Sequence, residues 1–194
     1  SGAMKTSLGA GTIMYQPVLV VGTYDADGRP NVMTAAWGGI CCSSPPCIYV
    51  SVRKARLTYA NLMERKAFTV SVPSQEQIDE ADFIGIASGR DVDKFGTTGL
   101  TPIRSELVDA PYVEEFPLVL ECKVTSMNDL GAHTQFVGEI IDVKADDACL
   151  DADGKLLLAR VAPVIYATSE RTYFAIGEPV ANAYECGRRF GIPS

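Results

Sequence analysis

The residues best suited to binding chemistry are the basic side chains, which gather in three places along an acidic chain. They follow a predicted strand, lie in a loop near position 90 and recur near the end, and comprise Arg53, Lys54, Arg56, Arg90, Lys94, Arg188 and Arg189. Hydroxyl residues accompany the first two groups, namely Ser51, Thr58 and Ser88. Guanidinium, hydroxyl and glycine amide groups suit a phosphate monoester, and each charge-assisted hydrogen bond contributes roughly 1.5–3 kcal/mol. Solvated loop charges are the alternative, and the residues alone leave both interpretations open.

Acid–base chemistry near neutral pH would fall on His133, the single histidine of the chain. An exposed loop histidine without a function is the alternative. No spacing matches a Ser–His–Asp or Cys–His arrangement, a P-loop or a G-x-G-x-x-G turn. Asp91 and Asp93 favour local ion pairs and Asx turns over a cation site. With one histidine and no C-x-x-C pair, the sequence predicts no metal site.

The stretch from Asn31 to Arg53 is expected to position these groups. It predicts two strands, 31–37 and 47–53, joined by a loop of Gly, Cys, Ser and Pro residues. The small side chains at the end of the first strand leave backbone N–H and C=O groups uncovered. A large flat ligand could lie against this segment, beside Trp37.

The remaining pattern predicts short strands linked by turns. They cover 18–24, 67–72, 118–125, 135–144, 164–167 and 172–176. A short helix is expected after Leu57, and a capping box at Ser74 and Gln77 predicts a second helix to about Ala87. Residues 88–100 are expected to be a loop, and 102–117 irregular with one short strand near 104–107. In 118–125 the alternation predicts Leu118, Leu120, Cys122 and Val124 inward and Glu121 and Lys123 outward.

Seven or eight strands with two or three helices predict a mainly β fold with attached helices. An antiparallel barrel is expected, because closure removes the edges that short strands would expose. We expect a cloning remnant and native start at 1–4, one domain over 5–177, and a tail at 178–194 that packs on the domain or on a partner subunit.

The composition limits which binding partners and which cellular compartment are expected for the protein. A formal charge of −7 argues against nucleic acid and anionic membranes as partners. No apolar run reaches the roughly 18 residues of a membrane span, so a cytoplasmic protein is expected. The six cysteines lie mostly among apolar or small residues, which favours reduced thiols over disulfides.

Four stretches together resemble one known family: PNVMTAAWGG, SPPCIYVSVRKARLTYANL, SGRDVDKF and LGAHTQFVGEI. The chain resembles the flavin reductase-like domain family, and within it the flavoredoxin group, whose fold is an FMN-binding split barrel. The matching stretches extend from about Val18 to Ile176. The resemblance implies one non-covalent FMN per subunit of a homodimer whose interface helps to form the flavin site.

The resemblance also implies which residues contact the flavin. The ring and ribityl chain would be lined by Asn31, Met33, Thr34, Ala35, Ala36 and Trp37, with Cys42, Ser43 and Ser44 on the same rim. The phosphate end would be held by Ser51, Arg53, Arg56, Thr58, Ser88, Arg90, Lys94 and Phe95. His133 matches a Gly-x-His loop near the exposed flavin face, where it would act as the catalytic residue for a docked nicotinamide or other substrate.

The implied activity is an FMN-dependent oxidoreductase. It would move electrons from NAD(P)H or a redox partner to a small-molecule acceptor or redox protein. The alternatives are an electron carrier without NAD(P)H turnover and a flavin-binding module with no turnover at all. Cys41 and Cys42 form an additional thiol pair beside the expected flavin, and either redox activity or simple packing fits them.

Overall fold

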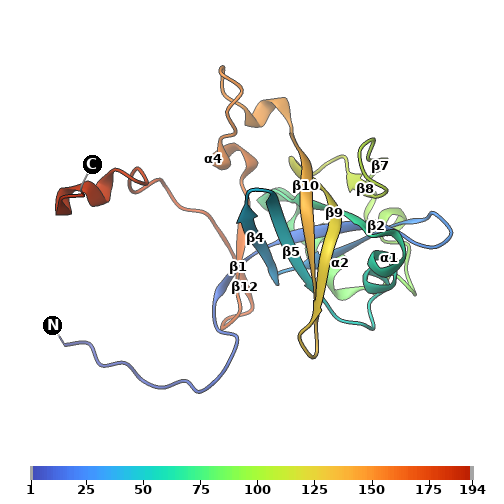
Figure 1. Cartoon of the computed structure of the whole chain (residues 1–194), viewed down its shortest axis with the longest axis horizontal. Coiled ribbons are helices and arrows are strands. Elements are labelled where there is room, and N and C mark those ends of the chain that lie inside the picture. Colours follow the sequence, from blue (N-terminus) through green and yellow to red (C-terminus); the bar gives the residue numbers. More distant parts are fainter. Residues whose placement is uncertain (1, 193–194) are drawn as a thin grey trace.

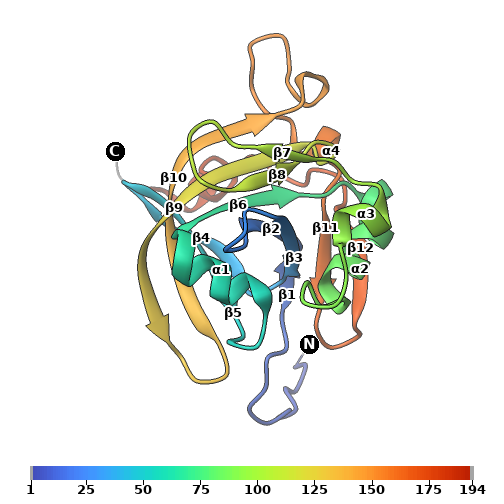
Figure 2. The ribbon, with the colours of Figure 1, turned by 90° about the vertical axis from the view of Figure 1, so that its right-hand side faces the viewer.

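Antiparallel strands dominate the computed structural model, which describes residues 2–192 (Figure 1). One sheet contains seven strands in the spatial order β3 (Pro30–Ala35), β2 (Leu19–Tyr24), β6 (Ala67–Val72), β9 (Leu118–Asp129), β10 (Thr134–Ala145), β5 (Pro46–Val52) and β4 (Gly38–Ser43). Only Ala36 and Trp37 separate β3 from β4, so the two edge strands of this sheet are neighbours along the chain. The sheet therefore curls into a barrel (Figure 2).

Smaller elements surround the barrel. A three-stranded sheet has the order β1 (Tyr15–Pro17), β11 (Val164–Ala167) and β12 (Thr172–Ala175), and a two-stranded sheet pairs β7 (Pro102–Arg104) with β8 (Pro111–Val113). The α-helices are α1 (Leu57–Arg65), α2 (Ile78–Ile86), α3 (Lys94–Thr98) and α4 (Leu158–Val161), and the 3-10 helices are η1 (Gln75–Gln77), η2 (Asp147–Cys149) and η3 (Cys186–Phe190). Helix α1 lies across one end of the barrel (Figure 2).

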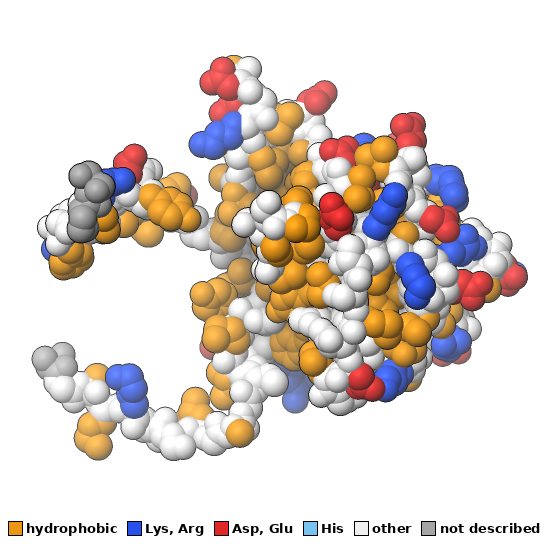
Figure 3. All heavy atoms as spheres, in the orientation of Figure 1, with side chains coloured by type: hydrophobic (Ala, Val, Ile, Leu, Met, Phe, Trp, Pro, Cys, Tyr) orange, Lys and Arg blue, Asp and Glu red, His pale blue; other side chains and the backbone are white. Residues whose placement is uncertain are grey.

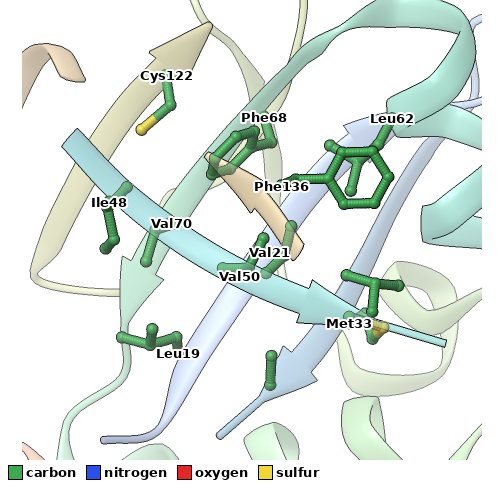
Figure 4. Close-up of a cluster of buried hydrophobic side chains, with 12 residues drawn as sticks. Leu19, Val21, Met33, Ile48, Val50, Leu62, Phe68, Val70, Cys122 and Phe136 are labelled. Atoms are coloured by element: carbon green, nitrogen blue, oxygen red, sulfur yellow. The ribbon is translucent and has the colours of Figure 1, made fainter. Parts of the chain in front are cut away.

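The barrel interior holds one apolar cluster with contributions from six strands and α1 (Figure 4). Its members include Leu19, Val21, Met33, Ile48, Val50, Leu62, Phe68, Val70, Cys122 and Phe136. The β9–β10 register shifts between Val137 and Gly138. A Cβ at Gly138 would lie 2.5 Å from the Phe68 ring, so glycine at this position leaves room for that ring.

A second cluster attaches α2 and α3 to the outer side of β2 and β3. It contains Val20, Val32, Ala81, Ile84, Phe95, Leu100, Val113 and Phe116. Because α2 packs directly on β3, the C-terminal end of this helix lies beside the end of that strand. This arrangement brings together segments that are about fifty residues apart in the sequence.

Most predicted elements are confirmed, including the mainly β class, the helix after Leu57 and the capping box at Ser74 and Gln77. The expected loop after Trp37 is wrong, because Gly38–Ser43 pairs with β5 as strand β4 and leaves only Ser44 and Pro45 as the turn. The prediction of one loop over 88–100 is also wrong, since α3 forms there behind an Asp93 cap that accepts from the Gly96 N–H.

Glu121 points away from the barrel interior, as predicted, whereas Leu120, Cys122 and Val124 face it. Its side chain is nevertheless fully buried, because the segment before β8 packs on the same outer face of the sheet, against β6. Thr69 anchors that segment by donating to the Pro111 carbonyl (2.6 Å), and Lys144 pairs with Glu121 at 2.5 Å. Residues 102–113 form the two strands β7 and β8, where one strand at 104–107 was predicted. With twelve strands and four α-helices, the described residues exceed the predicted count.

Both chain ends project from the same side of the barrel as long arms (Figure 1). The described part of the tail, 178–192, is exposed throughout and so does not pack on its own domain. Among the described residues, no helix combines the length and the apolar character needed to cross a membrane.

Candidate functional site

A groove of about 220 Å³ lies where β3 ends, between β5 and α2. Five parts of the chain line it: the end of β3, the end of β5 with the segment after it, α2, the β9–β10 loop and β11. The lining residues are Met33, Thr34, Ala35, Ala36, Trp37, Ser51, Val52, Arg53, Arg56, Gly85, His133 and Tyr166. The structure thus brings together nine of the residues that the sequence nominated.

Backbone hydrogen bonds fix the floor of the groove at Ala36 and Trp37. The Ser51 N–H donates to the Trp37 carbonyl (2.8 Å), which joins the end of β3 to β5. The Ala36 carbonyl accepts from the Gly38 N–H (3.1 Å) and from the Gln16 side-chain amide (2.9 Å). With only methyl side chains at Ala35 and Ala36, the main chain here stays accessible to a ligand.

Three side chains bind this floor to helix α2 through carbonyls of the helix. The Thr34 hydroxyl donates to the Ala81 carbonyl (2.5 Å), and an Arg56 guanidinium nitrogen donates to the Gly85 carbonyl (3.1 Å). The last carbonyls of a helix have no partner within it, and a cation there also interacts favourably with the helix dipole. Arg56 therefore caps α2 while its other donors remain available to the groove.

Lys94 is the third of these side chains. It was predicted to bind the phosphate, but its ammonium is buried and bound to backbone carbonyls. It is 3% exposed, and its ammonium donates to the carbonyls of Val32 and Ile84, each at 2.8 Å. Burial, and secondarily the charge of Arg56, lowers the pKa of Lys94 to about 8. The structure thus places this lysine beneath the groove, where it joins β3 to the end of α2.

His133 faces the groove from the β9–β10 loop and is half-buried. Burial, and secondarily the nearby Arg53 charge, lowers the pKa of this imidazole below its ordinary value. The imidazole is therefore mainly neutral at neutral pH, and can accept a proton or a hydrogen bond. Arg53 itself is exposed, so its guanidinium is accessible to an anion.

The other predicted site residues lie elsewhere. Cys42, Ser43 and Ser44 are exposed at the tip of the β4–β5 hairpin, about 20 Å along β4 from Trp37. Asn31 donates to the Thr58 hydroxyl (3.3 Å), and both side chains are buried. A separate hollow is lined by Asn31, Arg90, Lys94 and Phe95 among others, and the Ser88 hydroxyl accepts from the Arg90 N–H.

Two adjoining hollows extend the groove and contain residues that the sequence did not nominate. One shares Trp37, Ser51 and His133 with the groove and adds Gln16, Tyr49, Leu130, Ala132 and Gln135. The other shares Thr34, Ala36, Gly85 and Tyr166 and adds Val18, Asp82, Ile86 and Tyr173. Only Gly85 carried a sequence signal, since a glycine inside a helix often marks a close approach of backbone.

The sequence comparisons identify the family of the chain. A model described as the flavin reductase like domain matches residues 11–175. The chain belongs to this family. Flavoredoxin of Desulfovibrio vulgaris (Miyazaki F) is 52% identical and superimposes with a TM-score of 0.91, over 95% of this chain and 100% of that one. The expected flavoredoxin group is thereby confirmed.

Two further solved structures support the fold. Flavoredoxin from Methanosarcina acetivorans is 26% identical with a TM-score of 0.88, over 98% of this chain and 100% of that one. A flavin reductase with a split barrel domain from Shewanella frigidimarina is 24% identical with a TM-score of 0.79, over 88% and 86% of the two chains. The split-barrel fold is thus confirmed, and the family and its neighbours support a flavin-related oxidoreductase.

Removing the Arg53 charge is expected to raise the pKa of His133. The arginine disfavours the imidazolium, so Arg53→Ala should move this pKa upward toward its ordinary value. An NMR titration of the only histidine measures it directly. Arg90→Ala, which removes an exposed cation from the separate hollow, serves as the control. An unchanged His133 pKa in Arg53→Ala would show that the two groups do not interact.

Removing Lys94 is expected to weaken the fold. Lys94→Ala leaves the Val32 and Ile84 carbonyls without their charged donor, which should lower the free energy of unfolding by roughly 2–4 kcal/mol. Urea denaturation at pH 7 measures the change. Lys54→Ala, which breaks an exposed pair with Asp129, should leave the free energy of unfolding nearly unchanged. If Lys94→Ala instead left the free energy of unfolding unchanged and weakened phosphate binding, Lys94 would be a phosphate ligand, as the sequence predicted.

Proposed function

We propose that the protein is an FMN-dependent oxidoreductase that takes electrons from NAD(P)H or a redox partner protein and passes them to a small-molecule acceptor or a redox protein. The observation that carries the proposal is the groove, which combines accessible main chain at Thr34–Trp37 with Arg53 and Arg56. Membership of the flavin reductase-like family supports a flavin, and two guanidinium groups suit its phosphorylated form.

The residues present fit such a cofactor in an open site. Closed ligand sites typically measure about 300–1,000 Å³, so a groove of about 220 Å³ would not enclose a flavin. The adjoining hollows of about 510 and 190 Å³ lengthen it on either side. An elongated ligand with a flat ring and a charged tail is compatible with this shape, and one face of the ring would remain accessible.

The chain supplies binding and electrostatics, and FMN when bound supplies the hydride and electron chemistry that side chains lack. Arg53 and Arg56 would hold the phosphate, with Arg56 oriented in advance by the Gly85 carbonyl. Because β3 is an edge strand, alternate N–H groups on it are not used by β2. These amides would stabilise negative charge that develops beside them.

His133 would serve the second substrate. The hollow that it shares with Trp37 also presents Tyr49, Leu130 and Gln135, which combine apolar surface with amide groups. Such a lining suits a nicotinamide ring with its carboxamide. The neutral imidazole would exchange a proton or a hydrogen bond with the docked molecule.

We also propose that the protein is a homodimer in which the partner covers the open side of the groove. Both arms expose apolar side chains, including Met4, Leu8, Val180, Tyr184 and Phe190. Figure 3 shows further apolar side chains on the barrel face between the arms. The arms leave the domain next to β1 and β12, whose Gln16 and Tyr173 line the hollows. Exposed apolar surface of this extent is typical of a subunit interface.

The same proposal places the protein in the cytoplasm. Nicotinamide donors are available there, and thiols such as those of Cys122 and Cys149 remain reduced.

Anaerobic reduction tests the function. The full chain is reconstituted with FMN and freed of unbound flavin, and the flavin absorbance is followed after addition of NADH or NADPH. Rapid loss of absorbance is the expected result. Retained flavin that stays oxidised would contradict direct nicotinamide turnover and favour an electron carrier. Failure to retain FMN at all would contradict the assignment of the groove.

Replacement of His133 separates cofactor binding from reduction. His133→Ala should leave FMN affinity unchanged and slow reduction by the nicotinamide by about tenfold or more. His133→Asn, which retains a hydrogen-bonding group but cannot exchange a proton near neutral pH, distinguishes positioning from proton transfer. Loss of bound flavin in both variants would instead show that the histidine is structural.

Truncation tests the dimer. The full chain should show twice the monomer mass by light scattering, and a chain limited to residues 14–177 should shift to monomer, because both arms are removed. A monomeric full chain would refute the dimer. A truncated chain that stays dimeric would show that the interface lies on the barrel instead.

A further inference from the structure

The register of the β4–β5 hairpin brings two cysteines directly opposite each other. Cys42 pairs with Cys47, one step inside the Ser43–Pro46 pair that closes the turn. Directly opposed residues of an antiparallel ladder have Cα atoms about 4.5 or 5.5 Å apart, depending on the pair type. A disulfide spans Cα separations of about 4.4–6.8 Å. The Cα separation therefore already lies within the range that a disulfide spans, and only a small approach of the two Cβ atoms is needed.

The thiols of Cys42 and Cys47 differ in their exposure to solvent. Cys42 is exposed on the edge strand, whereas Cys47 on β5 is only 6% exposed. Side chains of opposed residues share one face of a sheet, so the two thiols lie side by side. Burial, and then the neighbouring Cys42 and Cys41 thiols, raises the pKa of Cys47. An oxidant in solution would consequently meet Cys42 first.

Cys41 is the competing partner for Cys42, because it is also exposed and adjacent in sequence. It occupies the register shift between Ile40 and Cys42, so it has no opposed residue on β5. Across the described residues, no group of three His, Cys, Asp or Glu side chains is arranged to hold a metal ion. The hairpin therefore contains one pair of directly opposed thiols, Cys42 and Cys47, with the Cys41 thiol next to them.

We propose that Cys42 and Cys47 form a reversible disulfide that responds to small-molecule disulfides. The deprotonated Cys42 sulfur attacks the oxidant, which breaks its S–S bond, forms a mixed disulfide and releases one thiol. The deprotonated Cys47 sulfur then attacks the Cys42 sulfur, which forms the protein disulfide and releases the second thiol. Two protein thiols are oxidised, one disulfide is reduced, and both protons go to the released thiols.

Geometry makes this bond easy to reverse. Directly opposed Cβ atoms lie about 4.5–5.5 Å apart, whereas a relaxed disulfide holds them at about 3.5–4.5 Å. The strands would have to approach each other, and strained or exposed disulfides are the readily reduced ones. The site is independent of the flavin groove, which lies at the other end of the hairpin.

Differential labelling of the full chain tests the proposal. The reduced protein is incubated with oxidised glutathione and denatured, and its free thiols are blocked with one alkylating reagent. After reduction, newly released thiols receive a second reagent, and tandem mass spectrometry locates each label. We expect the second label on Cys42 and Cys47 equally, and the first on Cys41, Cys122, Cys149 and Cys186. Reduced glutathione added before blocking should abolish the second label.

Single variants decide between the pairings. Cys41→Ser should keep the second label on Cys47, and Cys42→Ser should remove it; circular dichroism checks that both variants fold. A monomer mass on a non-reducing gel excludes a bond between chains. The proposal is overturned by second label on Cys41 and Cys42 instead, by a stable glutathione adduct on Cys42 with Cys47 unchanged, or by no oxidation of either cysteine.

Discussion

The hydrogen bond from the Ser51 N–H to the Trp37 carbonyl is the contact on which the rest of the structure depends. It joins the end of β3 to β5 at the point where the chain turns from one edge of the sheet into the other. Closure of the barrel and exposure of the Ala36 main chain therefore have the same origin. A large side chain at Ala35 or Ala36 would disturb both, because methyl groups leave this backbone uncovered. The groove is a consequence of how the sheet closes.

Helix α2 converts that junction into a defined site. Thr34, Arg56 and Lys94 donate to carbonyls of Ala81, Gly85 and Ile84, so the helix end is held against β3 by three polar side chains. Two of the three are cations beside the unpaired carbonyls of a helix C-terminus, where positive charge is stabilised. The remaining cation of the groove, Arg53, makes none of these contacts, and its charge adds to burial in lowering the pKa of His133.

Local sequence patterns predicted most strands and helices. The features that these patterns missed depend on contacts between segments that are distant in the sequence. Alternating apolar residues and turn residues located most strands, and nine groove residues followed from the motifs at 30–39, 44–62 and 130–140. Strand β4 was missed because its Gly, Cys and Ser residues resemble a loop until β5 pairs with them. The role of Lys94 and the burial of Glu121 depend on α2 and on the segment before β8, and no nearby residue indicates either. Tyr166 lines the groove from β11, which lies over one hundred residues after β3 and β5 in the sequence.

The most direct test of the account compares FMN with riboflavin, which lacks only the phosphate. Fluorescence titration of the apoprotein should show tighter binding of FMN. Arg53→Ala should then weaken FMN binding by about 1.5–3 kcal/mol, or roughly tenfold to a hundredfold, and leave riboflavin affinity unchanged. Arg90→Ala, in the separate hollow, should change neither affinity. Equal losses for both flavins, or an effect confined to Arg90→Ala, would contradict the placement of the phosphate in this groove.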